Sequence, residues 1–108
     1  MKVLGIDPGL ADTGIGVVHG HGLRIDGFAF GSIATSQKEE QSKRLEIIYT
    51  KVLGVLRQEM PDLMVVEDVF SLEKYPKSGI LLGKVTGVIL LAGCHIKVPI
   101  KEIPVLEA

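Results

Sequence analysis

Two acidic residues stand at the ends of short apolar runs and are the first candidates for chemistry in this sequence. Asp7 ends the run at residues 3–6. Glu67 repeats that arrangement after residues 63–66. A charged side chain is rarely placed at the edge of a core unless a partner or a metal ion compensates it. Asp7 and Glu67 therefore form the predicted centre of the functional site.

The runs that carry these acids are predicted to be neighbouring parallel strands. A helical segment separates the strand that ends at Asp7 from the strand that ends at Glu67, and such a crossover makes the strands parallel. Parallel strands finish at the same edge of a sheet, where ligands bind in such folds. We therefore expect Asp7 and Glu67 to lie close together. The residues of the first strand are apolar on both faces, apart from Asp7, which predicts that both faces are covered.

Asp7 and Glu67 together could hold a metal ion. Two carboxylates held close together raise the pKa of one of them unless a cation lies between them. Mg²⁺ or Mn²⁺ is the simplest cation for a site made only of oxygen ligands. The alternative is that one of the acids pairs with a lysine or caps a turn. The residues alone leave both interpretations open.

A tight turn and a hairpin follow Asp7. Gly9 is expected to adopt a backbone angle that other residues avoid. Strands are predicted over residues 13–19 and 23–31, joined by a turn at residues 20–22 that contains two glycines. These elements would place two strands beside the one that carries Asp7.

A helix is predicted between this hairpin and the strand of Glu67, ending at Met60 before a proline. Ser36 and Glu39 resemble a capping box at its start. Its apolar residues recur at spacings of three, four and one, which is typical of one buried stripe; they are Leu45, Ile48, Val52, Val55 and Leu56. A last strand is expected over residues 98–103.

The run from Ser78 to Ile96 is predicted to be a buried helix of a soluble protein. A bilayer takes about 20 apolar residues, and Lys84 near the middle would cost about 2.5 kcal/mol or more inside one. Gly79, Gly83 and Gly87 recur every four residues, so they share one face. In a helix interior, each glycine lowers the stability of the helix by about 1 kcal/mol relative to alanine. Three on one face predict a close backbone approach, either to the sheet or to the same helix of a second subunit.

The composition is that of one domain spanning residues 1–108. The formal net charge of −1 argues against a strongly basic nucleic-acid module but leaves room for a local basic patch. Cys94 is the only cysteine, which excludes an internal disulfide and favours a reducing compartment. No signal peptide or membrane association is expected, and the predicted location is the cytoplasm.

Several groups of residues, taken together and in order, resemble a known family. They are Ile6-Asp7-Pro8-Gly9, Thr13-Gly14 with Gly16-Val17-Val18, Val66-Glu67-Asp68-Val69-Phe70, and Leu82-Gly83 with Gly87-Val88. In this combination they resemble the RuvC family of Holliday-junction resolvases over the whole chain. No single motif among them is as specific as the combination.

The resemblance implies an α/β, ribonuclease-H-like fold with a mixed five-stranded sheet flanked by helices. It implies a homodimer, formed through the helix Ser78–Ile96, that binds four-way junction DNA in recombination and repair and works with branch-migration proteins. It also implies hydrolysis with Mg²⁺ or Mn²⁺ that nicks two symmetric strands. In the family, four carboxylates hold two metal ions. The first two match Asp7 and Glu67.

The resemblance also implies contacts to DNA. Phe70 matches a residue that stacks on bases at the junction crossover, a contact worth about 1–3 kcal/mol per base. The alternative is a core aromatic that closes the strand. Two basic positions of the family helix are not basic here, and Lys74, Lys77 and Lys84 could restore the charge nearby. These four residues are the predicted DNA-binding set.

The other two family carboxylates belong to a helix that would follow residue 108. On the family pattern the last helices are missing, so the chain is either a fragment or a short relative. If the protein is this short in the cell, we expect weak metal binding and poor or absent cleavage.

Two other classes of function stay open. An Asp-Pro-Gly turn followed by a Thr-Gly hairpin also occurs, in variant form, in sugar kinases and actin-like ATPases, where it cradles phosphates. This chain is too short for their two lobes and has no second nucleotide motif. The other class is a catalytically incomplete junction-binding or interaction module, which would keep Phe70 and the dimer helix without activity.

Overall fold

The computed structural model describes residues 1–108 except 22–23, 69–75 and 105–108. In chain order the elements are β1 (Lys2–Asp7), β2 (Asp12–His21), β3 (Arg24–Ala34), α1 (Gln41–Glu59), β4 (Leu63–Asp68), α2 (Pro76–Ile96) and β5 (Ile100–Pro104). Every predicted strand and helix is present. The strands of the hairpin are longer than predicted, and α1 and β5 begin later.

The strands form one mixed five-stranded sheet in the order β3-β2-β1-β4-β5. β1 pairs antiparallel with β2 and parallel with β4, and β5 lies parallel to β4. The α/β fold class and the parallel arrangement of the two acid-bearing strands are therefore confirmed.

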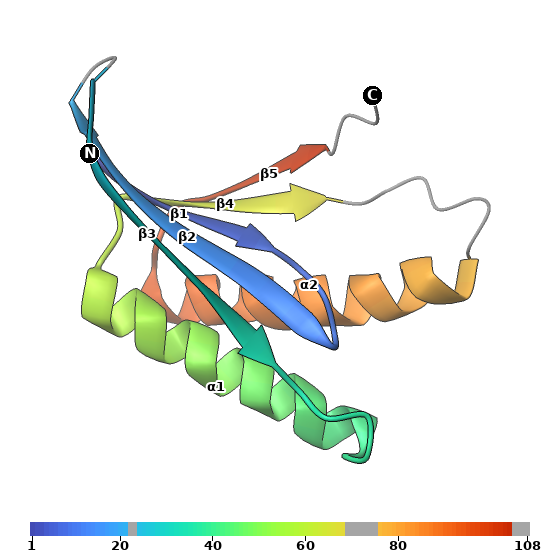
Figure 1. The fold of residues 1–108 in the computed structure, drawn as a ribbon. Helices are drawn as coiled ribbons and strands as arrows, with labels where there is room; N and C mark the ends of the chain where they lie inside the picture. The colour runs from blue at the N-terminus through green and yellow to red at the C-terminus, as the bar shows by residue number, and fades with distance from the viewer. Residues whose placement is uncertain (22–23, 69–75, 105–108) are drawn as a thin grey trace.

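Both helices lie against the same face of the sheet (Figure 1). Leu4 and Ile6 are buried on that side, with 0% and 2% of their surface exposed. Strand alternation directs Gly5 and Asp7 to the opposite face, which we call the open face. In the part of the chain that the structure describes, no helix covers the open face. The prediction that both faces of β1 are covered is met on the helix side only.

The predicted stripe of α1 forms the middle of the core. Ile48, Val52 and Leu56 recur every four residues and are completely buried. From α2, Val85, Ile89 and Ala92 are completely buried as well. The two helices also contact each other through Tyr49 of α1 and His95 of α2, whose rings meet edge to face with centroids 5.9 Å apart. Burial of these stripes holds both helices to the sheet.

The predicted capping box at Ser36 is wrong. The N-terminal cap of α1 is Glu40, and its side chain makes no capping hydrogen bond. Ser36 instead closes a local turn, because its Oγ accepts from the backbone N–H of Lys38 at 3.2 Å and its carbonyl accepts from Glu39 at 3.1 Å. A serine that bonds its own downstream backbone in this way competes with helix formation. The helix therefore starts several residues later.

One of the two predicted alternatives, a close approach of the evenly spaced glycines to the sheet, is not met at Gly83 and Gly87. Gly83 and Gly87 are exposed, and a Cβ added to either would meet no atom within 4 Å. Gly93, which the sequence reasoning missed, makes that contact: its Cβ would lie 2.6 Å from Met64 Cε and 2.7 Å from Ile100 Cδ1. The second alternative, a contact between two copies of α2, stays a prediction. By length and composition, α2 could also cross a membrane.

Candidate active site

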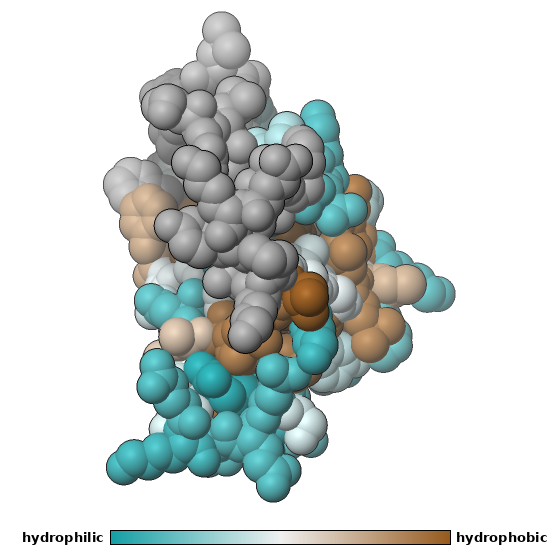
Figure 2. Space-filling view, turned by 90° about the vertical axis from the view of Figure 1, so that its right-hand side faces the viewer, coloured by the Kyte–Doolittle hydropathy of each residue, from teal (hydrophilic) through white to brown (hydrophobic). Residues whose placement is uncertain are grey.

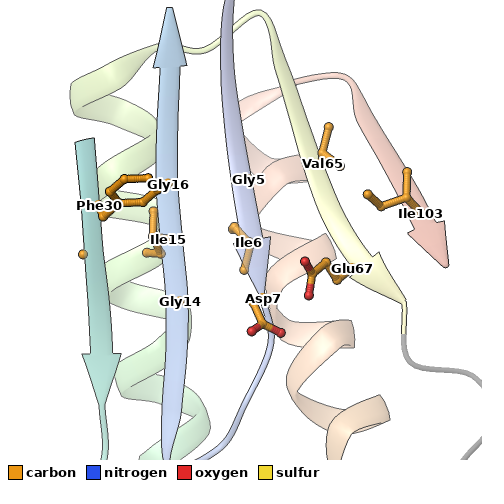
Figure 3. Close-up of a pocket in the computed structure, with 11 residues that line it drawn as sticks. Gly5, Ile6, Asp7, Gly14, Ile15, Gly16, Phe30, Val65, Glu67 and Ile103 are labelled. Carbon is orange, nitrogen blue, oxygen red and sulfur yellow. The ribbon is translucent and has the colours of Figure 1, made fainter. Parts of the chain in front are cut away.

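The structure brings Asp7 and Glu67 together at the ends of β1 and β4. Ile6 lies opposite Val66 in the parallel register, so the next residue of each strand is an acid. Figure 3 shows both carboxylates on the open face, with the side chain of Glu67 directed towards Asp7. The predicted juxtaposition follows from the register of two parallel strands and the two-residue period of their side chains.

A shallow groove of about 360 Å³ runs across the open face and ends at these carboxylates. Its floor includes Gly5, Gly14 and Gly16, where the absence of side chains leaves the backbone accessible (Figure 3). A Cβ added to Gly14 would lie 3.6 Å from Cβ of Asp7, and one added to Gly16 would lie 3.4 Å from the ring of Phe30. The strands thus form a flat approach to Asp7.

The remaining walls of the groove are apolar. Val65 and Ile103 line it on one side, and Phe30, with 78% of its surface exposed, lines it on the other. Apart from Asp7 and Glu67, none of the described lining residues is charged. The two acids therefore determine the electrostatic character of the groove.

Burial raises the pKa of the Glu67 carboxyl above its ordinary value, and hydrogen bonding to Asp7 and the negative charge of Asp7 raise it further. Among the described residues, no lysine or arginine pairs with either carboxylate. The alternative that a lysine neutralises Asp7 or Glu67 therefore finds no support in the described part of the chain. The pair has an excess of negative charge that a cation would relieve.

These two carboxylates fit a hard divalent cation. They offer only oxygen ligands, and Mg²⁺ is commonly bound through one or two carboxylates while it keeps several waters. In the described residues, no third histidine, cysteine or acid joins them to complete a group of three. Asp68, the next residue of β4, alternates to the opposite face. The structure therefore brings together two candidate ligands from this chain.

The turn after Asp7 is held by a buried threonine, Thr13, to which the sequence analysis assigned a place in a motif but no structural role. Thr13 is completely buried, its hydroxyl donates to the carbonyl of Gly9 at 2.6 Å, and it accepts from the N–H of Gly9 at 3.3 Å. Thr13 occupies the same face of β2 as Val17, which is also buried. A hydroxyl among buried positions indicates a structural hydrogen bond, and this pattern could have identified it.

Thr13→Val is expected to lower the free energy of unfolding by about 1–3 kcal/mol, because it leaves polar groups of Gly9 without their partner. Valine keeps nearly the same shape, so the loss reports the hydroxyl. Urea denaturation followed by circular dichroism measures the change. Thr50→Val is the control: Thr50 is exposed on α1, and its replacement should stay within about 0.5 kcal/mol of the wild type. Equal losses in both variants would contradict this role for Thr13.

Gly9 is required for a different reason than predicted. It does not adopt a left-handed backbone conformation; instead, a Cβ at this position would lie 2.3 Å from the carbonyl oxygen of Asp12. The end of β3 braces the same loop, because the hydroxyl of Thr35 donates to the carbonyl of Leu10 at 2.5 Å. Arg44 Nε donates to that same hydroxyl oxygen at 2.8 Å. The turn that follows Asp7 is thus fixed from two sides.

Of the four predicted DNA-binding residues, Lys84 is the one whose side chain the structure describes, and it lies away from the carboxylates. Lys84 lies on the helix side, where its Nζ donates to Gln41 Oε1 of α1 at 3.0 Å, and it does not line the groove. Phe70 and Lys74 lie outside the described residues, and Lys77 belongs to the first turn of α2. Figure 2 views the molecule from the end at which β1 and β4 finish, where hydrophilic residues gather below, near the start of α1.

Glu67→Gln is expected to stabilise the metal-free protein at pH 7. Because the pKa of Glu67 is raised by folding, the folded state binds more protons than the unfolded state between the ordinary glutamate value of 4.5 and the folded pKa. Stability contributed at this position is therefore present at low pH and is lost as the pH rises through that window. The variant should melt about 2–4 °C higher than the wild type at pH 7, and the difference should vanish below pH 4.5.

Differential scanning calorimetry in a chelating buffer between pH 4 and pH 8 measures this difference. Glu46→Gln is the matched control, because hydrogen bonding to Lys43 and its charge lower the pKa of Glu46. That variant should show no stabilisation at pH 7. A Glu67→Gln protein that is no more stable than the wild type at pH 7 would contradict a raised pKa of Glu67 in the folded state.

The comparisons with known proteins agree with one another. Residues 3–107 match the family model described as crossover junction endodeoxyribonuclease RuvC. The protein of that name from Halothermothrix orenii is 38% identical over 107 residues, which are 99% of this chain and 64% of the relative. This chain therefore spans less than two thirds of the length of that relative.

Solved structures give the same result. The structure of T. thermophilus RuvC in complex with a Holliday junction substrate superposes with a TM-score of 0.88 at 30% identity, covering 96% of this chain and 65% of that one. A yeast mitochondrial Holliday junction resolvase has a TM-score of 0.62 at 10% identity over 95% of this chain and 52% of its own, which shows likeness of fold alone. The match over nearly the whole chain and the paired acids of β1 and β4 lead to one conclusion. The chain belongs to the RuvC family and has its ribonuclease-H-like fold.

Proposed function

We propose that the protein is a metal-dependent endodeoxyribonuclease that nicks four-way DNA junctions, in which Asp7 and Glu67 bind the metal. The observation that carries the proposal is the meeting of these two unneutralised carboxylates at the end of a flat groove. The similarity to a protein whose structure contains a Holliday junction substrate supports the choice of DNA.

Phosphodiester groups are anionic, so two bare carboxylates would repel the DNA strand that they are meant to cut. Asp7 and Glu67 would hold Mg²⁺ or Mn²⁺, which would cancel their two negative charges and supply the means to activate a water and to stabilise the leaving oxygen. The chain's own contribution is to hold the carboxylates in place. The glycines in the floor of the groove would let a sugar-phosphate backbone approach them closely.

We propose that Phe70, Lys74, Lys77 and Lys84 contact the DNA. Stacking of an aromatic ring on a base tolerates any sequence, and lysines contact phosphates without reading bases. Such contacts suit recognition of a junction by its shape. In this proposal the protein acts in the cytoplasm, in recombination and repair, together with branch-migration proteins.

We also propose a homodimer formed through α2. Two-fold symmetry would present two active sites to two strands, as symmetric nicking requires. Ile80 and Leu91 of α2 are 65% and 49% exposed, and Gly83 and Gly87 leave open space beside them. An exposed apolar helix face with small residues permits close packing against a second copy.

Sedimentation at tens of micromolar tests the dimer. The wild type should sediment with twice the 11.6 kDa mass of the chain, and Leu91→Glu should shift it to the monomer because a charge cannot be buried in an apolar contact. Thr50→Glu, an exposed position of α1, should leave the dimer intact. A wild type that stays monomeric, or a Leu91→Glu protein that stays dimeric, would contradict the α2 interface.

A catalytically incomplete junction-binding module is the second candidate. It is favoured by the observation that the described residues supply two carboxylates and no third ligand beside them. Such a protein would bind four-way junctions and leave them uncut.

One experiment separates the two candidates. The protein is incubated with a labelled synthetic four-way junction and Mg²⁺, and the products are run on native and denaturing gels beside a linear duplex of the same sequence. A shifted junction with paired symmetric nicks is the expected result. A shifted junction without nicks supports the binding module, and equal binding of junction and duplex contradicts both functions.

A further inference from the structure

A second hollow lies between the outer strand of the sheet and helix α1, and the proposed nuclease function does not use it. Its volume is about 440 Å³. The residues that line it are Ile15, Gly31, Ser32, Ile33, Lys51, Gly54, Val55 and Gln58. Because α1 forms one wall, this hollow opens on the helix side of β3, whereas Asp7 and Glu67 face the open side.

The hollow exists because two glycines border it. A Cβ added to Gly31 of β3 or to Gly54 of α1 would meet no atom within 4 Å. Ile15, Ile33 and Val55 supply apolar surface. A space of this kind, lined mainly by aliphatic groups, suits one apolar side chain.

The strand that forms one wall is also the edge of the sheet. β3 pairs only with β2, and in the described part of the chain no strand pairs with its outer side. Ala29 and the residues from Phe30 to Ser32 are exposed. An exposed edge offers backbone N–H and C=O groups that can hydrogen-bond with an added strand.

The rim of the hollow carries positive charge. Lys51 and Gln58 lie about one helical turn before and after Gly54 on the same strip of α1. Neither makes a hydrogen bond or ion pair with any residue that the structure describes. Among the described residues that line the hollow there is no aspartate or glutamate. An occupant with a carboxylate near Lys51 would therefore complement this charge.

We propose that this hollow is a docking groove for an extended segment of another protein, which adds a strand to β3. Alternate side chains of a strand point to the same face. One apolar side chain of the segment fills the space between Gly31 and Gly54, and an acidic residue two positions away reaches Lys51. The class of partner is thus a protein with an exposed extended segment that combines an apolar and an acidic residue at this spacing.

A peptide fits these features better than a nucleic acid does. A sugar-phosphate backbone has no alternating N–H and C=O groups to match an edge strand, and its bases prefer aromatic surfaces. The apolar side chains that line the hollow are aliphatic, and no described aromatic ring lines it. This inference stands on its own evidence and does not depend on the nuclease proposal.

The test uses an end-blocked peptide with a central leucine, glutamates two positions to either side and serine or threonine elsewhere. A matched peptide carries lysines in place of the glutamates. Binding to the whole ¹⁵N-labelled protein is followed by backbone amide resonances. We expect the acidic peptide to shift the resonances of residues 29–33 and to slow their hydrogen exchange, and the lysine peptide to bind at least about fivefold more weakly.

Two substitutions and one control complete the test. Gly54→Leu fills the hollow, favours the helix more than glycine does, and should abolish binding without loss of folding by circular dichroism. Lys51→Glu should weaken binding of the acidic peptide at least about fivefold, whereas Arg57→Glu, the same charge change at an exposed position of α1 outside the hollow, should not.

Several results would overturn the proposal. They are undiminished binding to Gly54→Leu, equal binding of the two peptides, or protection of residues 29–33 by a DNA duplex and not by the acidic peptide. Protection of the same amides by raising the protein concentration alone would assign the groove to a second copy of this chain. That outcome too would overturn the docking of a different protein.

Discussion

Asp7→Asn should lower the rate of junction nicking at least about 10²- to 10³-fold. The amide removes one of the two negative charges that would bind the divalent cation, and such an ion contributes several kcal/mol of transition-state stabilisation. Asparagine keeps the size of the side chain, so the turn held by Thr13 and Gly9 should persist. Single-turnover cleavage of a labelled four-way junction in Mg²⁺ measures the effect.

Direct metal binding gives a second readout for the same variant. Titration with Mn²⁺, followed by electron paramagnetic resonance of the free ion, should show weaker binding by Asp7→Asn and by Glu67→Gln. The matched control is Asp68→Asn, which changes the neighbouring acid of β4 on the opposite face of the strand. It should retain both nicking and metal binding. Loss of both in Asp68→Asn, or unchanged Mn²⁺ binding in Asp7→Asn, would assign the metal to other ligands.

Gly9→Ala should lower the free energy of unfolding by about 2–4 kcal/mol. The added methyl group would lie 2.3 Å from the carbonyl oxygen of Asp12 and 3.3 Å from its carbonyl carbon. The clash is with backbone atoms, which cannot swing aside as the end of a flexible side chain can. The whole turn between β1 and β2 must therefore shift, and the hydrogen bonds between Gly9 and Thr13 are strained with it.

Urea denaturation monitored by circular dichroism measures this loss, and Gly54→Ala is its control. A Cβ at Gly54 meets no atom within 4 Å in the described structure, and alanine is favoured over glycine in a helix by about 0.8–1.0 kcal/mol. Replacing glycine by alanine should thus lower the free energy of unfolding at Gly9, in the turn, and raise it at Gly54, in α1. A Gly9→Ala protein as stable as the wild type would show that the turn adapts to a side chain without cost.

The Gly9 turn also links stability to the site. Because β1 ends at Asp7, two residues before Gly9, a shift of the turn is expected to disturb the contact between the carboxylates of Asp7 and Glu67. The pKa of Glu67 depends in part on hydrogen bonding and charge from Asp7. A Gly9→Ala protein that remains folded should therefore show a smaller upward shift in the pKa of Glu67.

The pairing of Asp7 with Glu67 was predictable from the sequence. It requires only two apolar runs that end in an acid, a helical segment between them, and the rule that such a crossover makes neighbouring strands parallel. The stripe of Ile48, Val52 and Leu56 was predictable for a similar reason, because the period of a helix alone places these residues on one face. Both inferences start from apolar runs and spacings within single elements, which can be recognised in the sequence without knowledge of the packing.

The tertiary structure alone decided the features that depend on residues far apart in the chain. Sequence periodicity could not tell that α1 and α2 cover the same face of the sheet, which leaves Asp7 and Glu67 on the open face (Figure 1). The close contact of α2 with the sheet comes at Gly93, where Met64 and Ile100 approach from separate strands.

The hollow beside Lys51 also arises only on folding, since Gly31 and Gly54 belong to elements that meet in three dimensions. The sequence by itself determined which residues share a face within each element, because side-chain direction follows local backbone geometry. Which faces meet, and what space they leave between them, depends on how whole elements pack. That packing is a property of the assembled chain and not of any one segment.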